Sequence, residues 1–163
     1  MEMEVEVVRS TRRRKTIQAY EVGGVLRVAI PAACTAEEEA HWVGVMVKRF
    51  ERRRSTATVD LVARAAELAR RYGLPEATSI RWVDNQSTLW GSCTMVDGAI
   101  RISSRLAEMP RWVLDYVIVH ELTHLVVPGH GPAFNELVDR YPKAERARGY
   151  LIAKGTSEPD DVD

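Results

Sequence analysis

The spacing of hydrophobic and polar positions changes several times along the chain, and each change marks a predicted element. Residues 2–8 alternate between charged and apolar side chains, which is typical of a strand with one buried face. Residues 16–22 and 25–30 are strand-like too, and Gly23-Gly24 between them is a two-residue hairpin signal. The chain therefore begins with three predicted strands, the last two of which form a hairpin.

Helical spacing follows these strands. Thr35 is a predicted N-cap, because the acidic residues 37–39 suit the positive end of a helix dipole. This helix runs to about residue 53. A second helix is predicted for about residues 58–72, with leucines and alanines on one face and Gly73 ending it.

Short strands return after the second helix. Residues 79–83, 88–94 and 99–103 are separated by polar turns, which predicts a small antiparallel meander. Pro110 then precedes an apolar segment, residues 112–127, which is apolar on nearly every face and predicts a buried helix.

Two shorter helices are predicted to follow. Pro132 suits the first turn of a helix, and apolar residues between 134 and 141 recur with a helical period. We interpret this stripe as core that supports the buried helix. A last helix is predicted for residues 143–153, so the fold class is α+β.

The length and composition are those of an ordinary soluble domain: 163 residues, 45% hydrophobic and 28% charged. They predict one domain, residues 1–155, followed by an acidic flexible tail, residues 156–163. No apolar run reaches membrane-spanning length, and the first residues lack the apolar core of a signal peptide. We therefore expect a cytoplasmic protein without membrane contact.

The formal net charge is zero, but the charges are unevenly distributed. Residues 1–75 contain 14 Lys/Arg against 10 Asp/Glu, and residues 76–163 contain 9 against 13. The basic residues cluster at positions 9–15 and 48–54. Such clusters can make weak contacts with nucleic acids or nucleotides, although a charge run is more often a solvated surface.

Three of the four histidines lie between residues 120 and 130, two of them in the pattern H-E-L-T-H at residues 120–124. Histidines four residues apart project from one face of a helix, so His120 and His124 can reach the same metal ion. Glu121 can then act as a general base toward water that the metal activates. The alternative, hydrogen-bonded core histidines, is the weaker interpretation, because buried polar side chains are costly unless paired or bound.

A third histidine can complete the site from outside the helix. Pro128 and Gly129 end the helical pattern, so His130 comes from a turn and can approach the metal from another direction. Three histidines are a ligand set of catalytic zinc, because the fourth position stays open for water. The predicted cofactor is one Zn²⁺, although such sites also accept other divalent ions.

Short motifs with characteristic spacing occur in the second half of the chain: L-W-G-S-C at 89–93, G-A-I at 98–100, Pro110, D-Y-V at 115–117, H-E-L-T-H at 120–124, His130 and Phe134. With these motifs the chain resembles the YgjP-like metallopeptidase domain family, which is related to the SprT and WLM zinc proteases. The resemblance implies a minimal zincin-like fold, in which the sheet packs on the helix that carries the H-E-x-x-H motif. It also implies zinc held by His120, His124 and His130, with Glu121 as the catalytic base. In zincins an edge strand beside this helix pairs with an extended substrate, and residues 99–103 are the candidate here.

Three residues near these motifs have both a functional and a structural interpretation. Tyr116 lies one turn before His120, where it could stabilise an oxyanion. Cys93 could be a metal ligand or a redox switch, and Trp90 could line the cleft. We interpret all three as buried structural residues, which is the commoner role of such side chains.

Three functions are compatible with these features. The leading one is a zinc-dependent peptidase that acts on a peptide or protein substrate. The second is a zinc hydrolase of nucleotides or other phosphate substrates, which the basic clusters could attract. The third is a non-enzymatic zinc-stabilised module that binds nucleic acid or protein. Glu121 argues against the third, because a structural zinc site needs no base and closes its fourth position with Cys or His.

Overall fold

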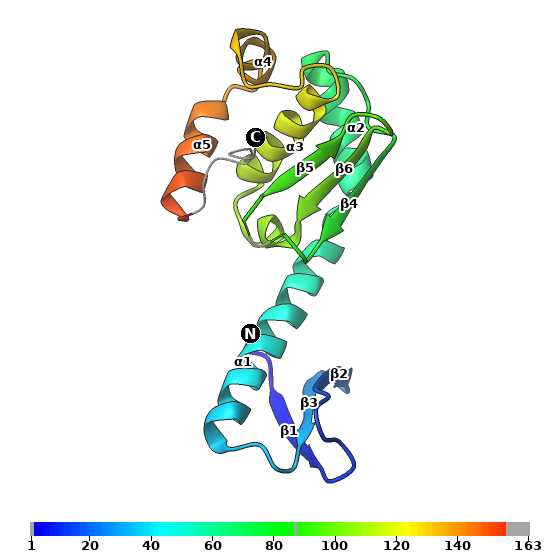
Figure 1. The fold of residues 1–163 in the computed structure, drawn as a ribbon, viewed down its shortest axis with the longest axis vertical. Coiled ribbons are helices and arrows are strands. Elements are labelled where there is room, and N and C mark those ends of the chain that lie inside the picture. Colours follow the sequence, from blue (N-terminus) through cyan, green and yellow to red (C-terminus); the bar gives the residue numbers. More distant parts are fainter. Residues whose placement is uncertain (1, 87, 156–163) are drawn as a thin grey trace. The chain divides into compact units, whose positions relative to one another are not determined.

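The computed structural model describes residues 2–86 and 88–155, and this part of the chain has the predicted α+β architecture (Figure 1). It contains five α-helices, one 3-10 helix and two three-stranded sheets. The contacts divide the chain between Arg54 and Ser55 into two compact units. The predicted acidic tail, residues 156–163, lies outside the described residues. Within those residues, no helix is both long and apolar enough to cross a membrane.

The first unit contains a mixed sheet. Its strands are β1 (Val5–Ser10), β2 (Gln18–Val22) and β3 (Val25–Pro31), in the order β1-β3-β2. β1 runs parallel to β3, and β2 and β3 form the predicted antiparallel hairpin. Gly23 and Gly24 in its turn have φ values of 59° and 84°, a region that favours glycine. Leu26, Val28 and Ile30 of the central strand are fully buried and form the core of this unit.

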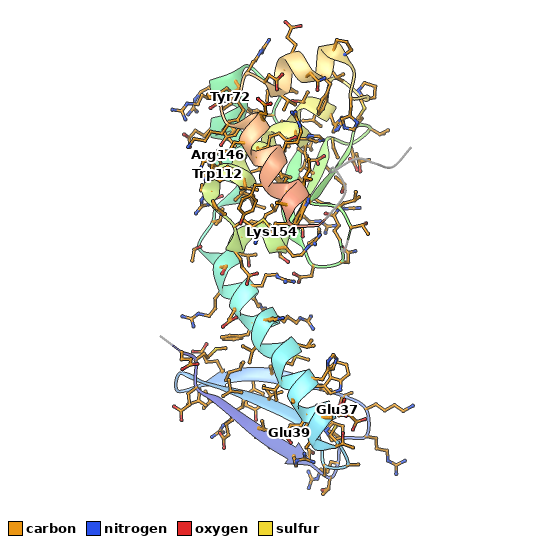
Figure 2. All side chains as sticks on the ribbon, turned by 90° about the vertical axis from the view of Figure 1, so that its left-hand side faces the viewer. Glu37, Glu39, Tyr72, Trp112, Arg146 and Lys154 are labelled. Carbon is orange, nitrogen blue, oxygen red and sulfur yellow. The ribbon has the colours of Figure 1, made fainter. Side chains whose placement is uncertain are left out.

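The helix that follows, α1 (Ala36–Ala57), begins with a capping box. The Thr35 hydroxyl accepts a hydrogen bond from the backbone N–H of Glu38 (3.1 Å), and the Glu38 carboxylate accepts one from the N–H of Thr35 (2.8 Å). Glu37 and Glu39 lie in the same first turn (Figure 2). The predicted start is confirmed, but the helix is longer than predicted.

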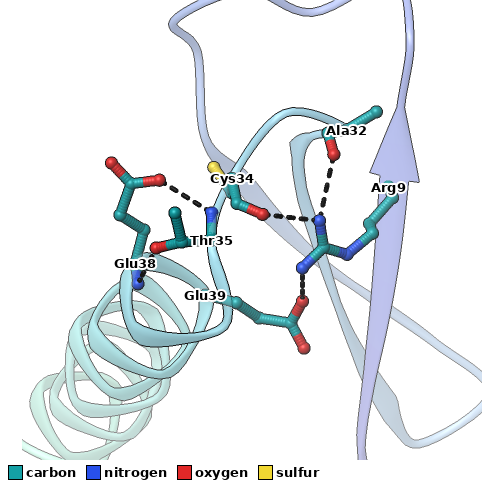
Figure 3. A network of polar contacts seen from close by, with 6 residues as sticks. All are labelled: Arg9, Ala32, Cys34, Thr35, Glu38 and Glu39. Carbon is teal, nitrogen blue, oxygen red and sulfur yellow. Dashed lines mark hydrogen bonds and ion pairs between the residues drawn. The ribbon is translucent and has the colours of Figure 1, made fainter.

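One residue of the first basic cluster has a structural role. Arg9 donates hydrogen bonds to the carbonyl oxygens of Ala32 (3.0 Å) and Cys34 (2.7 Å) and forms an ion pair with Glu39 (Figure 3). These contacts hold the loop between β3 and α1 against β1. A nucleic-acid contact through the remaining basic residues stays a prediction.

The sheet of the second unit is mixed, so the predicted antiparallel meander is wrong. Its strands are β4 (Ser79–Val83), β5 (Gly91–Thr94) and β6 (Ala99–Ser103), in the order β4-β6-β5. β5 and β6 form an antiparallel hairpin, but β4 is parallel to β6. β5 lies on the opposite side of β6 from β4, so β4 and β5 are not joined as a hairpin.

This strand order also corrects the predicted substrate strand. Residues 99–103 form the central strand and pair on both sides, so they offer no open edge to a peptide. Ile100 and Ile102 are buried, which is typical of a central strand. The edges of this sheet are β4 and β5.

α3 (Arg111–His124) carries His120 and His124, and four other helices of this unit contact it. They are α2 (Leu61–Tyr72), η1 (Ser104–Glu108, the 3-10 helix), α4 (Pro132–Val138) and α5 (Ala144–Ala153). α3 contacts β5 and β6 as well as the other three α-helices of this unit (Figure 1). Because α3 is buried on nearly every face, its sequence shows no polar stripe.

The predicted helix ends are partly correct. α2 begins later than predicted because the Asp60 carboxylate accepts a hydrogen bond from the N–H of Ala63 (3.0 Å) and caps the helix there. Gly73 ends it as predicted, with φ of 65°. Pro132 starts α4 as expected. η1 was not predicted.

Two polar contacts fix the first half of α3. Arg64 of α2 donates to both carboxylate oxygens of buried Asp115, at 2.7 and 2.5 Å. The hydrogen bond and the charge of Asp115 raise the pKa of Arg64 above its usual value. The Tyr141 hydroxyl donates to the carbonyl oxygen of Trp112 (2.9 Å), and burial raises the pKa of Tyr141 to about 12. α3 is therefore held firmly at the end opposite its histidines.

Candidate metal centre

The three predicted ligand residues converge in the structure. The Nε2 atom of His124 lies 3.2 Å from Nε2 of His120 and 3.1 Å from Nε2 of His130. One ligand atom of each residue lies within 4.8 Å of the others. His120 and His124 lie on consecutive turns of α3, whereas His130 comes from the loop before α4. The structure thus brings together side chains from two segments, as the sequence predicted.

The geometry of these imidazoles fits a bound metal ion. A tetrahedral zinc with bonds of about 2.0–2.1 Å would separate its nitrogen ligands by roughly 3.3 Å, close to the spacing observed here. Nδ1 of His124 lies 2.9 Å from the carbonyl oxygen of Val127. A carbonyl oxygen can only accept, so Nδ1 carries the hydrogen and the lone pair is on Nε2, the atom that faces the other histidines.

Phe134 of α4 contacts all three imidazoles. Its ring is stacked on His124 at a centroid distance of 4.6 Å and meets His120 and His130 edge-on at 4.8 Å. Only 2% of Phe134 is exposed. Phe134, the first residue of the predicted apolar stripe, therefore supports the three histidines, and the contact restricts the rotation of each imidazole.

Glu121 is fully buried against the edge strand β5. A methyl group on Gly91 would lie 2.7 Å from Glu121 Oε1 and 2.9 Å from its Cγ, closer than packed atoms approach. Only glycine therefore leaves room for the Glu121 side chain at this position. Gly91 belongs to the Trp-Gly-Ser-Cys motif, but no local pattern indicates that it contacts the predicted base.

We expect Gly91→Ala to displace Glu121 and to lower kcat/KM of a reaction in which Glu121 is the base by about 100-fold, because a shift of about 1 Å at a catalytic group can cost that much. Zinc content should be unchanged, since the atoms nearest the new methyl group belong to Glu121 and not to the three histidines. Gly44→Ala is the matched control, because a methyl group there meets no atom within 4 Å. Equal activities of the two variants would contradict the role assigned to Gly91.

The remaining candidates lie in the same unit. Trp90 is 2% exposed and packs in the core, with the Arg105 guanidinium 4.2 Å from its ring centroid. Cys93 is half-buried against that core. Tyr116 is 1% exposed, as expected of a structural tyrosine, and its ring lies 5.9 Å from that of His120.

A cavity of about 270 Å³ lies beside the histidines. Its lining residues are Tyr116, His120, His130, Phe134, Asn135 and Arg148. Asn135 and Arg148 were not singled out in the sequence. Asn135 and Arg148 lie near the histidines because α4 and α5 pack against α3. The local spacing of residues does not predict this packing.

Comparisons with known proteins indicate the family and the fold. The model of the YgjP-like metallopeptidase domain matches residues 10–153. No curated protein matches the chain. The metallopeptidase zymogen of Pyrococcus abyssi abylysin is 15% identical, with a TM-score of 0.51 over 57% of this chain and 92% of that chain. For the metallopeptidase zymogen of Methanocaldococcus jannaschii jannalysin the identity is 19% and the TM-score 0.51, over 59% of this chain and 97% of that chain. At such identities the two likenesses concern the fold alone.

Proposed function

Because the chain belongs to the YgjP-like metallopeptidase domain family, we propose that it is a zinc-dependent peptidase that cleaves peptide or protein substrates. The main support for this proposal is that the Nε2 atoms of three histidines lie close together. His120, His124 and His130 hold one Zn²⁺, and Glu121 is the general base. The family model crosses both compact units, which supports residues 1–155 acting as one domain.

Each of these residues has a distinct task. Zinc held by the three imidazoles would supply a Lewis acid that lowers the pKa of water and polarises the scissile carbonyl. Phe134 and the Val127 carbonyl keep the imidazoles oriented. Glu121 takes the proton of the attacking water on a carboxylate oxygen and passes it to the nitrogen of the leaving amine.

We further propose that the second unit is a minimal zincin-like fold whose edge strand β5 receives the substrate. α3, which carries the H-E-x-x-H motif, contacts both β5 and β6. An extended peptide can add to an open sheet edge through main-chain hydrogen bonds. β5 has such an edge, and its first residue, Gly91, contacts Glu121, so a peptide paired with β5 would run close to the base.

Hydrolysis of an unfolded protein tests the proposal. The purified chain is incubated with denatured casein, and new peptide ends are identified by mass spectrometry. We expect cleavage that stops when phenanthroline removes the metal and returns when zinc is added. Parallel reactions contain nucleotides and a phosphodiester. Hydrolysis of these alone would favour the phosphate-directed alternative, and hydrolysis of neither by the zinc-loaded protein would favour a binding module.

A further inference from the structure

We propose that the cavity beside the histidines is a substrate subsite for a carboxylate, so that the enzyme prefers peptides with an acidic group next to the scissile bond. The inference rests on the proposed function and names its substrate class. The carboxylate could be an Asp or Glu side chain or the C-terminal carboxylate of a peptide. Arg148 is the residue that would recognise it.

The position of the cavity makes it a subsite of the metal centre. His120 and His130 form part of its wall, so a group inside it would lie next to the proposed metal ligands. Its volume of about 270 Å³ is below the roughly 300–1,000 Å³ of sites for drug-sized ligands. It therefore suits one side chain or chain end. Tyr116 and Phe134 also line the cavity, but they are only 1% and 2% exposed, so its accessible surface is mainly polar.

Arg148 supplies the positive charge that would bind the carboxylate. It is half-buried on α5, and its guanidinium carbon lies 5.9 Å from the centroid of the Tyr116 ring. A guanidinium has five donors in a planar fork that matches the two oxygens of a carboxylate. A contact with the protein through some of these donors leaves others for a ligand.

The other polar groups of the cavity favour the same ligand. The Asn135 amide can donate a hydrogen bond to a carboxylate oxygen. Among the lining residues that the structure describes, none is acidic. Asp139 and Glu145 line a neighbouring cavity that Arg148 also borders. Arg148 therefore borders two cavities, one lined by acidic residues and one, beside the histidines, without them. In the cavity beside the histidines, the positive charge of Arg148 would repel a basic substrate side chain.

Matched peptides test this inference. A cleavage site found in casein is made with Glu, Gln or Lys at each position next to the scissile bond, inside a longer peptide with an amidated end. A second set ends at that residue with a free or amidated carboxyl group. We expect kcat/KM for the preferred acidic form to exceed that of its neutral counterpart by about 10- to 100-fold, as a charge-assisted hydrogen bond allows. The set that shows the preference identifies the source of the carboxylate.

Variants of Arg148 separate recognition from folding. Arg148→Gln should reduce the ratio of acidic to neutral rates to about one, and Arg148→Lys should keep part of it. Arg148→Glu should reverse the preference toward Lys, which a merely structural residue would not do. Arg146→Gln is the control, because it removes the same charge from α5, but Arg146 lies over the Trp112 ring at 4.7 Å (Figure 2). Its ratio should equal that of the wild type.

The outcomes distinguish this inference from the proposed function. If the wild type cleaves acidic and neutral peptides equally, or if Arg148→Gln keeps the preference, the inference is wrong and the peptidase assignment stands. If the zinc-loaded wild type cleaves none of the peptides, the proposed function fails and the inference fails with it. Zinc content and thermal unfolding of each variant show that the compared proteins are folded and loaded.

Discussion

Glu121→Gln is expected to lower kcat for peptide hydrolysis by about 1,000-fold or more while zinc stays bound. A general base typically increases the rate by a factor of about 10² to 10⁴, and an amide cannot take a proton from water. Glutamine has nearly the shape of glutamate, so it fits the space that Gly91 leaves beside β5. The three Nε2 atoms that converge belong to other residues, so the metal site should be unaffected.

Single-turnover hydrolysis of the casein-derived peptide, with zinc content measured in parallel, checks this expectation. Glu136→Gln is the charge-matched control, because Glu136 is exposed on α4. The control should retain wild-type kcat. Activity of Glu121→Gln within about tenfold of the wild type would show that another group takes the proton. Loss of zinc from this variant would contradict the claim that Glu121 acts as the base without helping to hold the metal.

Much of the local structure follows directly from the sequence. The Gly23-Gly24 hairpin, the Thr35 cap and the Gly73 helix end are each set by the conformational preferences of a few adjacent residues. The buried helix is evident because apolar side chains occur on nearly every face of its sequence. Such features depend on neighbours in the chain, so the sequence contains the information needed to predict them.

The sheet order could not be predicted in the same way. Strands that follow one another are usually adjacent, and this preference led to the wrong meander. The pairing of β4 with β6 depends on tertiary contacts between segments that are not adjacent in the sequence. The Arg64 to Asp115 contact also joins residues 51 positions apart. No local pattern indicates such a partner.

The candidate site likewise combines features that local sequence predicts with features that depend on tertiary packing. The spacing of His120, His124 and His130 indicates a common metal, because a helix and one turn bring them together. The packing of Phe134 on all three imidazoles and the fit of Gly91 against Glu121 depend on the path of whole elements. The sequence therefore indicated the chemical groups and placed Phe134 in a supporting stripe, but it did not indicate that Phe134 contacts all three imidazoles or that Gly91 lies against Glu121.

His124→Ala is expected to lower zinc affinity by more than about 100-fold, since changes in residues that only support a ligand already cost 10- to 100-fold. His124 is the central residue of the proposed ligand set, because its Nε2 lies 3.2 and 3.1 Å from those of His120 and His130. The wild type should also unfold at a higher temperature when zinc is added, since a ligand that binds the folded state stabilises it. The variant should lose this shift.

The most direct test of the metal centre is the zinc content of protein purified without a nickel column, measured by elemental mass spectrometry for wild type, His124→Ala and His41→Ala. His41 is the fourth histidine and lies exposed on α1 beside Trp42. We predict about one zinc per chain in the wild type and in His41→Ala, and almost none in His124→Ala. Absence of zinc from the wild type even after incubation with the metal, or equal zinc in all three proteins, would contradict the proposed zinc peptidase.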